Sequence, residues 1–185
     1  MKNIINRYKD SSLLHQWAMN ALVVFSLGFL IDYSILGISN GFDKTITQIT
    51  ADVSATILTW ITNAEVSAYV ERIGIQVCTE GNHCVYIGDA CNGRNLYIIY
   101  IGLLISIPYG TVWNKSVFII GGSILIFISN IIRIIALVLI IDVSFDMFGL
   151  LHHYIFQLLM YLLLFGLWNY YFKKTKIETK ESGGI

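Results

Sequence analysis

A single charged residue, Arg133, interrupts an otherwise apolar stretch that covers residues 116–141. A stretch of this length is enough for an α-helix to cross the bilayer core, which takes about 20 residues. An ionised group at that depth costs about 2.5–3.5 kcal/mol on insertion scales, so such groups usually face a partner or a water-filled cavity. We therefore expect a membrane-spanning helix here, and we treat Arg133 as a candidate functional residue.

The composition of the chain is that of an integral membrane protein. Of its 185 residues, 56% are hydrophobic and 13% are charged, whereas soluble domains carry about 25% charged residues. A single membrane domain, residues 1–185, is expected at this length. The net charge is zero, and no basic tract interleaved with aromatic residues indicates a nucleic-acid partner. The lipid bilayer is therefore the expected environment of most of the chain.

Four apolar segments predict four transmembrane helices. They cover residues 14–37, 93–110, 116–141 and 150–172. With four spans, most basic residues fall on one side of the membrane, namely Lys2, Arg7, Lys9, Lys115, Lys173, Lys174, Lys176 and Lys180. The positive-inside rule makes that side the cytoplasm. We expect a multi-pass protein of the plasma membrane, with both termini and the tail 173–185 in the cytoplasm. The first span is expected to be a retained anchor, because no small-x-small cleavage site follows it.

The segment 38–91 is expected outside the cell. Residues 42–63 place apolar side chains at three- and four-residue spacing, which predicts an amphipathic helix that lies on the membrane or packs over the bundle. Those apolar positions are Phe42, Ile46, Ile49, Val53, Ile57 and Ile61. Two β-rich runs then flank the turn TEGNH and predict a hairpin. The expected fold class is an all-α integral membrane protein with about four transmembrane helices, an external amphipathic helix and a small β-hairpin.

Cys91 stands in the sequence GDACNGRNLYIIY, where the hairpin gives way to the second span. A thiol at the N-terminus of a helix meets the positive end of the helix dipole, which favours the reactive thiolate. Gly93 has no side chain to block the approach of a substrate backbone. Arg94 and Asn95 share the helical face of Cys91 by their three- and four-residue spacing. The cysteine is a candidate nucleophile, with an inert buried thiol or a disulfide partner as the alternative.

In the predicted topology, Arg133 and a histidine pair lie on the same outer side of the membrane as Cys91. Asn130 precedes the arginine by three residues and shares its face. His152 and His153 open the last span. A histidine can carry a proton from a thiol to a leaving amine, and a fixed guanidinium can stabilise the oxyanion formed at a carbonyl. These residue types together predict acyl transfer in a water-filled cleft that opens outward.

Three short motifs resemble those of the exosortase/archaeosortase family: ACNG at residues 90–93, NIIR at 130–133 and LLHHYIF at 150–156. Asn92 stands where the family usually has serine. The resemblance implies a membrane cysteine transpeptidase and cleavage of a C-terminal sorting signal, made of a short motif, a transmembrane helix and a basic cluster. It implies Cys91, Arg133 and His152 as catalytic residues, with His153 as the alternate histidine. The acyl group then passes to a lipid or glycan amine or to water, and no metal or other cofactor is implied.

Two other functions stay open from the sequence. A membrane thiol–disulfide oxidoreductase would use Cys78, Cys84 and Cys91, and disulfides are common outside the cell. However, no C-x-x-C motif is present, and a bond between Cys78 and Cys84 would be structural and leave Cys91 as the odd thiol. The other alternative is a non-enzymatic membrane assembly factor, in which the buried arginine is a counter-ion. The carboxylates available for that pairing are Asp32 and Asp142.

Overall fold

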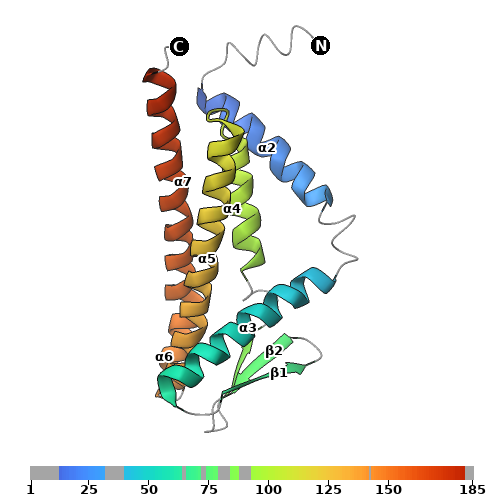
Figure 1. The fold of residues 1–185 in the computed structure, drawn as a ribbon, viewed down its shortest axis with the longest axis vertical. Coiled ribbons are helices and arrows are strands. Elements are labelled where there is room, and N and C mark those ends of the chain that lie inside the picture. The colour runs from blue at the N-terminus through green and yellow to red at the C-terminus, as the bar shows by residue number, and fades with distance from the viewer. Residues whose placement is uncertain are drawn as a thin grey trace. The chain divides into compact units, whose positions relative to one another are not determined.

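The computed structural model describes residues 13–31, 40–63, 66–71, 74–78, 84–87, 93–141 and 143–181. Figure 1 shows the helices and strands in these ranges. In chain order they are α2 (Leu13–Ile31), α3 (Asn40–Thr62), β1 (Ser67–Glu71), β2 (Gly74–Cys78), β3 (Cys84–Ile87), α4 (Arg94–Ser106), α5 (Val112–Ile141), α6 (Phe145–Leu150), the π-helical turn η2 (Leu151–Ile155) and α7 (Phe156–Glu181).

The chain forms two compact units, each built from separated parts of the sequence. The first unit comprises residues 1–38, 98–122 and 165–185, and the second comprises 39–97 and 123–164. The helices α4, α5 and α7 therefore contribute to both units. The first unit contains the segments that the charge distribution predicts on the cytoplasmic side. The second unit contains most of the segment that is predicted outside the cell.

In the first unit, α4 and α5 approach each other closely at Gly122. The ring of Tyr100 fills the space in which a Cβ atom on this glycine would lie. Tyr100 is fully buried, and its hydroxyl donates a hydrogen bond of 2.8 Å to the carbonyl oxygen of Phe118. Small residues at such contacts allow helices to pack tightly where lipid provides no hydrophobic driving force.

The turn between α4 and α5 is held by Lys115. Its Nζ donates hydrogen bonds to the carbonyl oxygens of Ile105, at 3.3 Å, and Ile107, at 2.6 Å. These bonds satisfy carbonyls that the end of α4 leaves without a helical partner. Lys174 of α7 lies 5.2 Å from the ring centroid of Phe118, one turn along α5 from Lys115. Lysines from two distant segments thus gather in one region, as the predicted topology requires, although the topology itself stays a prediction.

In the second unit, α3 lies across one face of a three-stranded antiparallel sheet with strand order β1-β2-β3 (Figure 1). The strands β2 and β3 form the predicted hairpin, and β1 adds a third strand to it. The core of this unit joins α3, the sheet and the second half of α5. Its buried members are Ala51, Ala55, Leu58, Ile75, Val77, Val85, Ile87, Ile134, Leu137 and Val138.

The predicted amphipathic helix is present as α3, but its aliphatic stripe does not form the packed face. Ile49 and Ile61 are 49% and 58% exposed. The buried residues of α3 are instead Leu58 and five small or polar residues, Thr47, Thr50, Ala51, Ser54 and Ala55. Small side chains let the helix backbone come close to the sheet. The helix packs in one core with the sheet and α5, and whether it also lies on the membrane stays a prediction.

Two helical segments among the described residues are long and apolar enough to cross a membrane, Val112–Ile141 and Met147–Thr175. Only 33% and 11% of their most apolar windows are buried, which differs from the core helix of a soluble protein. They correspond to the predicted spans 116–141 and 150–172. The helix α4 has 13 residues, fewer than a span needs. The four-span arrangement therefore stays a prediction.

Candidate active site

The helix α5 carries Asn130 and Arg133 into the interior of the second unit. Asn130 is fully buried, and Arg133 is 9% exposed. The Nε atom of Arg133 is buried, and no described residue forms a hydrogen bond with it. A buried donor left in this state costs about 1–3 kcal/mol, and more for a charged group. Charged groups within apolar helices usually face a partner or a water-filled cavity, so Arg133 stays a candidate functional residue.

Gly93 brings the start of α4 against Asn130. Its φ of +81° lies in the left-handed region that favours glycine. Its carbonyl oxygen accepts hydrogen bonds from the backbone N–H groups of Leu96, at 2.9 Å, and Tyr97, at 3.1 Å, and so begins the helix. A Cβ atom built on Gly93 would lie 3.6 Å from Nδ2 of Asn130. The glycine of the ACNG motif and the asparagine of the NIIR motif are therefore neighbours in space.

His152 lies in the π-helical turn η2, between α6 and α7. Ser144 begins α6, where its hydroxyl accepts a hydrogen bond of 3.4 Å from the backbone N–H of Met147. The half-buried ring of His152 stacks on Phe148 with ring centroids 5.6 Å apart and planes 8° apart. Arg133 and His152 both fall within residues 123–164, which belong to the second compact unit. The predicted catalytic histidine therefore lies in the same unit as Arg133.

The adjacent histidine has a different environment. His153 is exposed, and its ring meets that of His152 edge-on at 4.7 Å. A π-helical turn closes its hydrogen bonds over five residues instead of four, so it changes which side chains share a face. His153 and Gln157, four residues later, are both exposed. Such turns often occur at functional sites.

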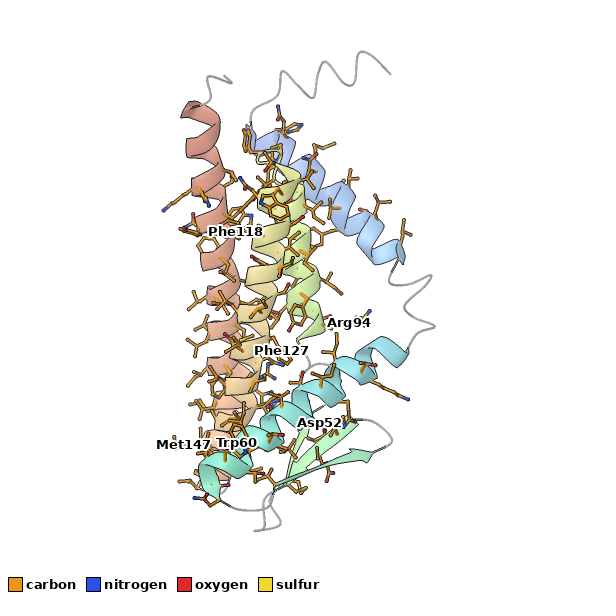
Figure 2. The ribbon with its side chains drawn as sticks, in the orientation of Figure 1. Asp52, Trp60, Arg94, Phe118, Phe127 and Met147 are labelled. Carbon is orange, nitrogen blue, oxygen red and sulfur yellow. A yellow bond between two sulfur atoms is a disulfide. The ribbon has the colours of Figure 1, made fainter. Side chains whose placement is uncertain are left out.

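The remaining predicted site residues fall into three groups. Arg94 is half-buried in the first turn of α4, and Asn95 beside it is exposed (Figure 2). Cys78 and Cys84 are joined by a disulfide with an S–S distance of 2.04 Å. Cys91 lies outside the residues that the structure describes, as do the alternative counter-ions Asp32 and Asp142.

One contributor to the site is missing from the sequence-based prediction. Phe148 supplies the aromatic surface under His152. Its position four residues before the histidine is the signal that could have revealed it, because such pairs are neighbours on a helix. In the described part of the chain, no group of three or more histidine, cysteine, aspartate or glutamate side chains could hold a metal ion.

These observations define a membrane protein with a polar, charged site built on its apolar helices. The family model described as transmembrane exosortase matches residues 11–170. The chain therefore belongs to the transmembrane exosortase family, and the resemblance seen in the three motifs is confirmed. Members of this family are generally cysteine transpeptidases of the membrane. No curated protein and no solved structure matches the chain.

Proposed function

We propose that this protein cleaves the C-terminal sorting signals of exported proteins by acyl transfer through Cys91. The observation that carries the proposal is the grouping of Gly93, Asn130, Arg133 and His152 in one compact unit. These four residues come from three motifs that are up to 59 positions apart in the chain (152 − 93). A buried guanidinium and a histidine are the residue types that acyl transfer uses to stabilise an oxyanion and to carry protons.

Chain connectivity links the proposed nucleophile to this group. Consecutive Cα atoms are 3.8 Å apart, so the Cα atom of Cys91 can be at most about 7.6 Å from that of Gly93. Gly93 in turn contacts Asn130, which lies one helical turn from Arg133. Cys91 is therefore two positions in the chain from a residue that contacts Asn130, and this supports its role as the nucleophile.

The proposed reaction has two acyl-transfer steps. His152 takes the proton of the Cys91 thiol, and the thiolate attacks the carbonyl carbon of the scissile peptide bond. Arg133 stabilises the negative charge on the carbonyl oxygen of the tetrahedral intermediate. The C–N bond breaks as His152 gives its proton to the leaving amine, and a thioester remains on Cys91. An amine or water attacks the thioester and gives a proton to His152, and the released thiolate takes that proton back.

The proposed substrate is a membrane-anchored protein whose sorting signal is a short motif, a transmembrane helix and a basic cluster. With four spans and both termini in the cytoplasm, the basic cluster of the substrate would share the side of Lys115 and Lys174. The scissile bond would then lie at the outer surface, beside the second unit. The acceptor is a lipid or glycan amine, or water when no amine reacts.

The disulfide argues against the oxidoreductase alternative. The chain has three cysteines, and Cys78 is bonded to Cys84 across directly paired positions of β2 and β3. A dithiol redox centre at Cys91 would have no second thiol. The assembly-factor alternative makes the buried arginine a counter-ion and gives no role to the histidine. It predicts that the thiol of Cys91 is dispensable, whereas the oxidoreductase alternative predicts that Cys91 takes part in an exchangeable disulfide.

The proposal is tested with an exported reporter that ends in a sorting signal shared by several exported proteins of the host. Cleavage of the reporter is followed as a shift in its mass in membrane fractions. We expect Cys91→Ala to abolish cleavage while the protein stays in the membrane at its normal level. Cleavage of the reporter at the wild-type rate by this variant would rule out the proposed reaction.

A further inference from the structure

The helix α3 has three distinct faces, and one of them is not explained by folding or by the proposed catalysis. Its small residues are buried, and Ile49 and Ile61 of its aliphatic stripe are exposed. The remaining face is polar and lies between these two around the helix axis. Its side chains are Gln48, Asp52, Thr56 and Thr59, with Trp60 at the border to the aliphatic stripe.

This polar face forms one wall of an open groove of about 370 Å³. The lining residues are Asp52, Ala55, Thr56, Thr59, Trp60, Val66 and Ala68. Asp52 and Trp60 lie on α3 about two turns apart, as Figure 2 shows, which corresponds to about 12 Å along the helix. This length accommodates three to four residues of an extended peptide, at about 3.3 Å per residue.

The other wall of the groove is an edge of the sheet. Within the described residues, β1 pairs with β2 alone, and β2 separates it from β3. Alternate residues of an antiparallel edge strand direct their N–H and C=O groups away from the paired strand. Ala68 is paired with Val77, whose side chain is buried under α3, so Ala68 faces the same side of the sheet. A strand added beside β1 would therefore point alternate side chains into the groove.

The groove presents hydrogen-bond acceptors. The hydroxyls of Thr56 and Thr59 donate to carbonyl oxygens of their own helix, at 2.8 and 3.0 Å, so their outward lone pairs remain as acceptors. Asp52 adds a carboxylate, of which Oδ1 accepts a hydrogen bond of 2.8 Å from Gln48. Trp60 is 78% exposed and offers an aromatic face to a cation. An occupant that fits this lining carries N–H donors and a positive charge.

We propose that this groove binds an extended stretch of the substrate polypeptide, which pairs with β1 and places a lysine or arginine side chain against Asp52. Peptide binding by strand addition takes its affinity from backbone hydrogen bonds and its specificity from alternate side-chain pockets. The inference rests on the proposed function, because the exported substrate supplies the peptide.

The surroundings of the groove favour the substrate over a second copy of this chain. The groove belongs to the same compact unit as Arg133 and His152. The exposed stripe next to it, with Ile49, Ile61 and Trp60, is suited to the membrane interface, where aliphatic and tryptophan side chains anchor amphipathic helices. A polypeptide that leaves the bilayer as an extended chain would pass this point. An edge-to-edge dimer would instead bring two copies of the Asp52 carboxylate into one groove.

Photo-crosslinking tests whether the substrate occupies the groove. A benzoylphenylalanine is placed at Thr59, in the full chain carrying Cys91→Ala, so that the reporter is bound but not consumed. Thr62 is the matched control, because it is an exposed threonine of α3 that also bonds to the carbonyl oxygen four residues earlier but does not line the groove. We expect a crosslink to the reporter from position 59 and at most a trace from position 62. A crosslinked dimer of the protein, or equal reporter crosslinking from both positions, would overturn the proposal.

Charge substitutions test the same groove by function. We expect Asp52→Lys to lower reporter cleavage about tenfold and Asp52→Asn to lower it less, because the first change introduces repulsion and the second only removes attraction. Alkylation of Cys91 by iodoacetamide should proceed as in the unmodified protein, since this small reagent needs no groove. Cleavage at the wild-type rate by both variants would refute peptide binding in the groove and would leave the proposed acyl transfer unaffected. Cleavage that persists in Cys91→Ala would instead refute the proposed function.

Discussion

The second unit of this protein buries a charged side chain, whereas the buried polar residues described in the first unit are uncharged. In the first unit, the buried hydroxyls of Ser106 and Thr175 donate to carbonyl oxygens of their own helices, at 2.8 and 3.0 Å. In the second unit, Arg133 is buried, and its Nε atom lacks a hydrogen-bond partner among the described residues. The comparison teaches that a polar group satisfied within its own helix supports the fold. A charge buried at a cost marks the place where chemistry is expected.

Apart from the loss of Cys91, substitution of His152 should have the largest effect on reporter cleavage, and substitution of the adjacent His153 should have little effect. His152→Ala should lower reporter cleavage by about 10²–10⁴-fold, the usual contribution of a general acid–base group. His153→Ala is the matched control, because His153 is exposed and should change the rate by less than about threefold. The measurement is the initial rate of cleavage at equal protein levels. The reverse order of the two variants would transfer the catalytic role to His153.

Substitution of Arg133 should have the next largest effect on the rate of cleavage. Its replacement by alanine should reduce cleavage by about 10²–10³-fold, the range for loss of one oxyanion-stabilising donor. Arg133→Lys should recover part of the rate, because lysine keeps the charge but not the planar set of donors. The folded fraction in detergent is measured in parallel. If Arg133→Ala cleaves normally, the arginine is a structural counter-ion.

In the first unit, substitutions should change stability and leave the chemistry intact. Gly122→Ala places a Cβ atom where the ring of Tyr100 lies, so we expect it to lower the free energy of unfolding by about 1–3 kcal/mol. Gly121→Ala is the matched control, since nothing lies within 4 Å of its Cβ position. Thermal unfolding in detergent measures both variants. In the folded fraction of Gly122→Ala, iodoacetamide should still alkylate Cys91 at the usual rate. A loss of that reactivity would mean that the substitution in the first unit also affects the function of the second.

The smallest expected effect concerns the disulfide. Changing both Cys78 and Cys84 to serine opens a short loop, with the two cysteines six positions apart, and should cost about 2 kcal/mol of stability. Cleavage of the reporter should persist, because the disulfide has no part in the proposed reaction. Complete loss of cleavage in a well-folded double variant would revive the redox alternative.

Hydrophobicity made the long helices predictable from the sequence. The apolar run at 116–141 predicted most of α5, which the structure extends to Val112–Ile141. The packed face of α3 was not predictable in this way, because Thr47, Thr50 and Ser54 are less apolar than the aliphatic stripe that they replace. In a membrane protein, aliphatic side chains can face lipid while small residues form the close contacts. Hydrophobic periodicity alone therefore does not show which face is buried.

For the candidate site, the sequence predicted the residue types, and the structure supplied their neighbours. The contact of Gly93 with Asn130 joins residues 37 positions apart (130 − 93), and no local pattern encodes it. The choice between His152 and His153 depends on a π-helical turn that ordinary helical spacing does not anticipate. Stacking on Phe148 and partial burial distinguish His152 from the exposed His153, and the catalytic role of His152 stays a prediction.

The most direct test of the account is to capture the acyl-enzyme. The unmodified protein is incubated with the reporter in membranes that contain no added amine, then digested and analysed by mass spectrometry. We expect the amino-terminal product of the reporter to be attached to the peptide that contains Cys91, through a bond that hydroxylamine cleaves. Attachment to another residue, or cleavage at the normal rate with Cys91 already blocked by iodoacetamide, would contradict the central claim.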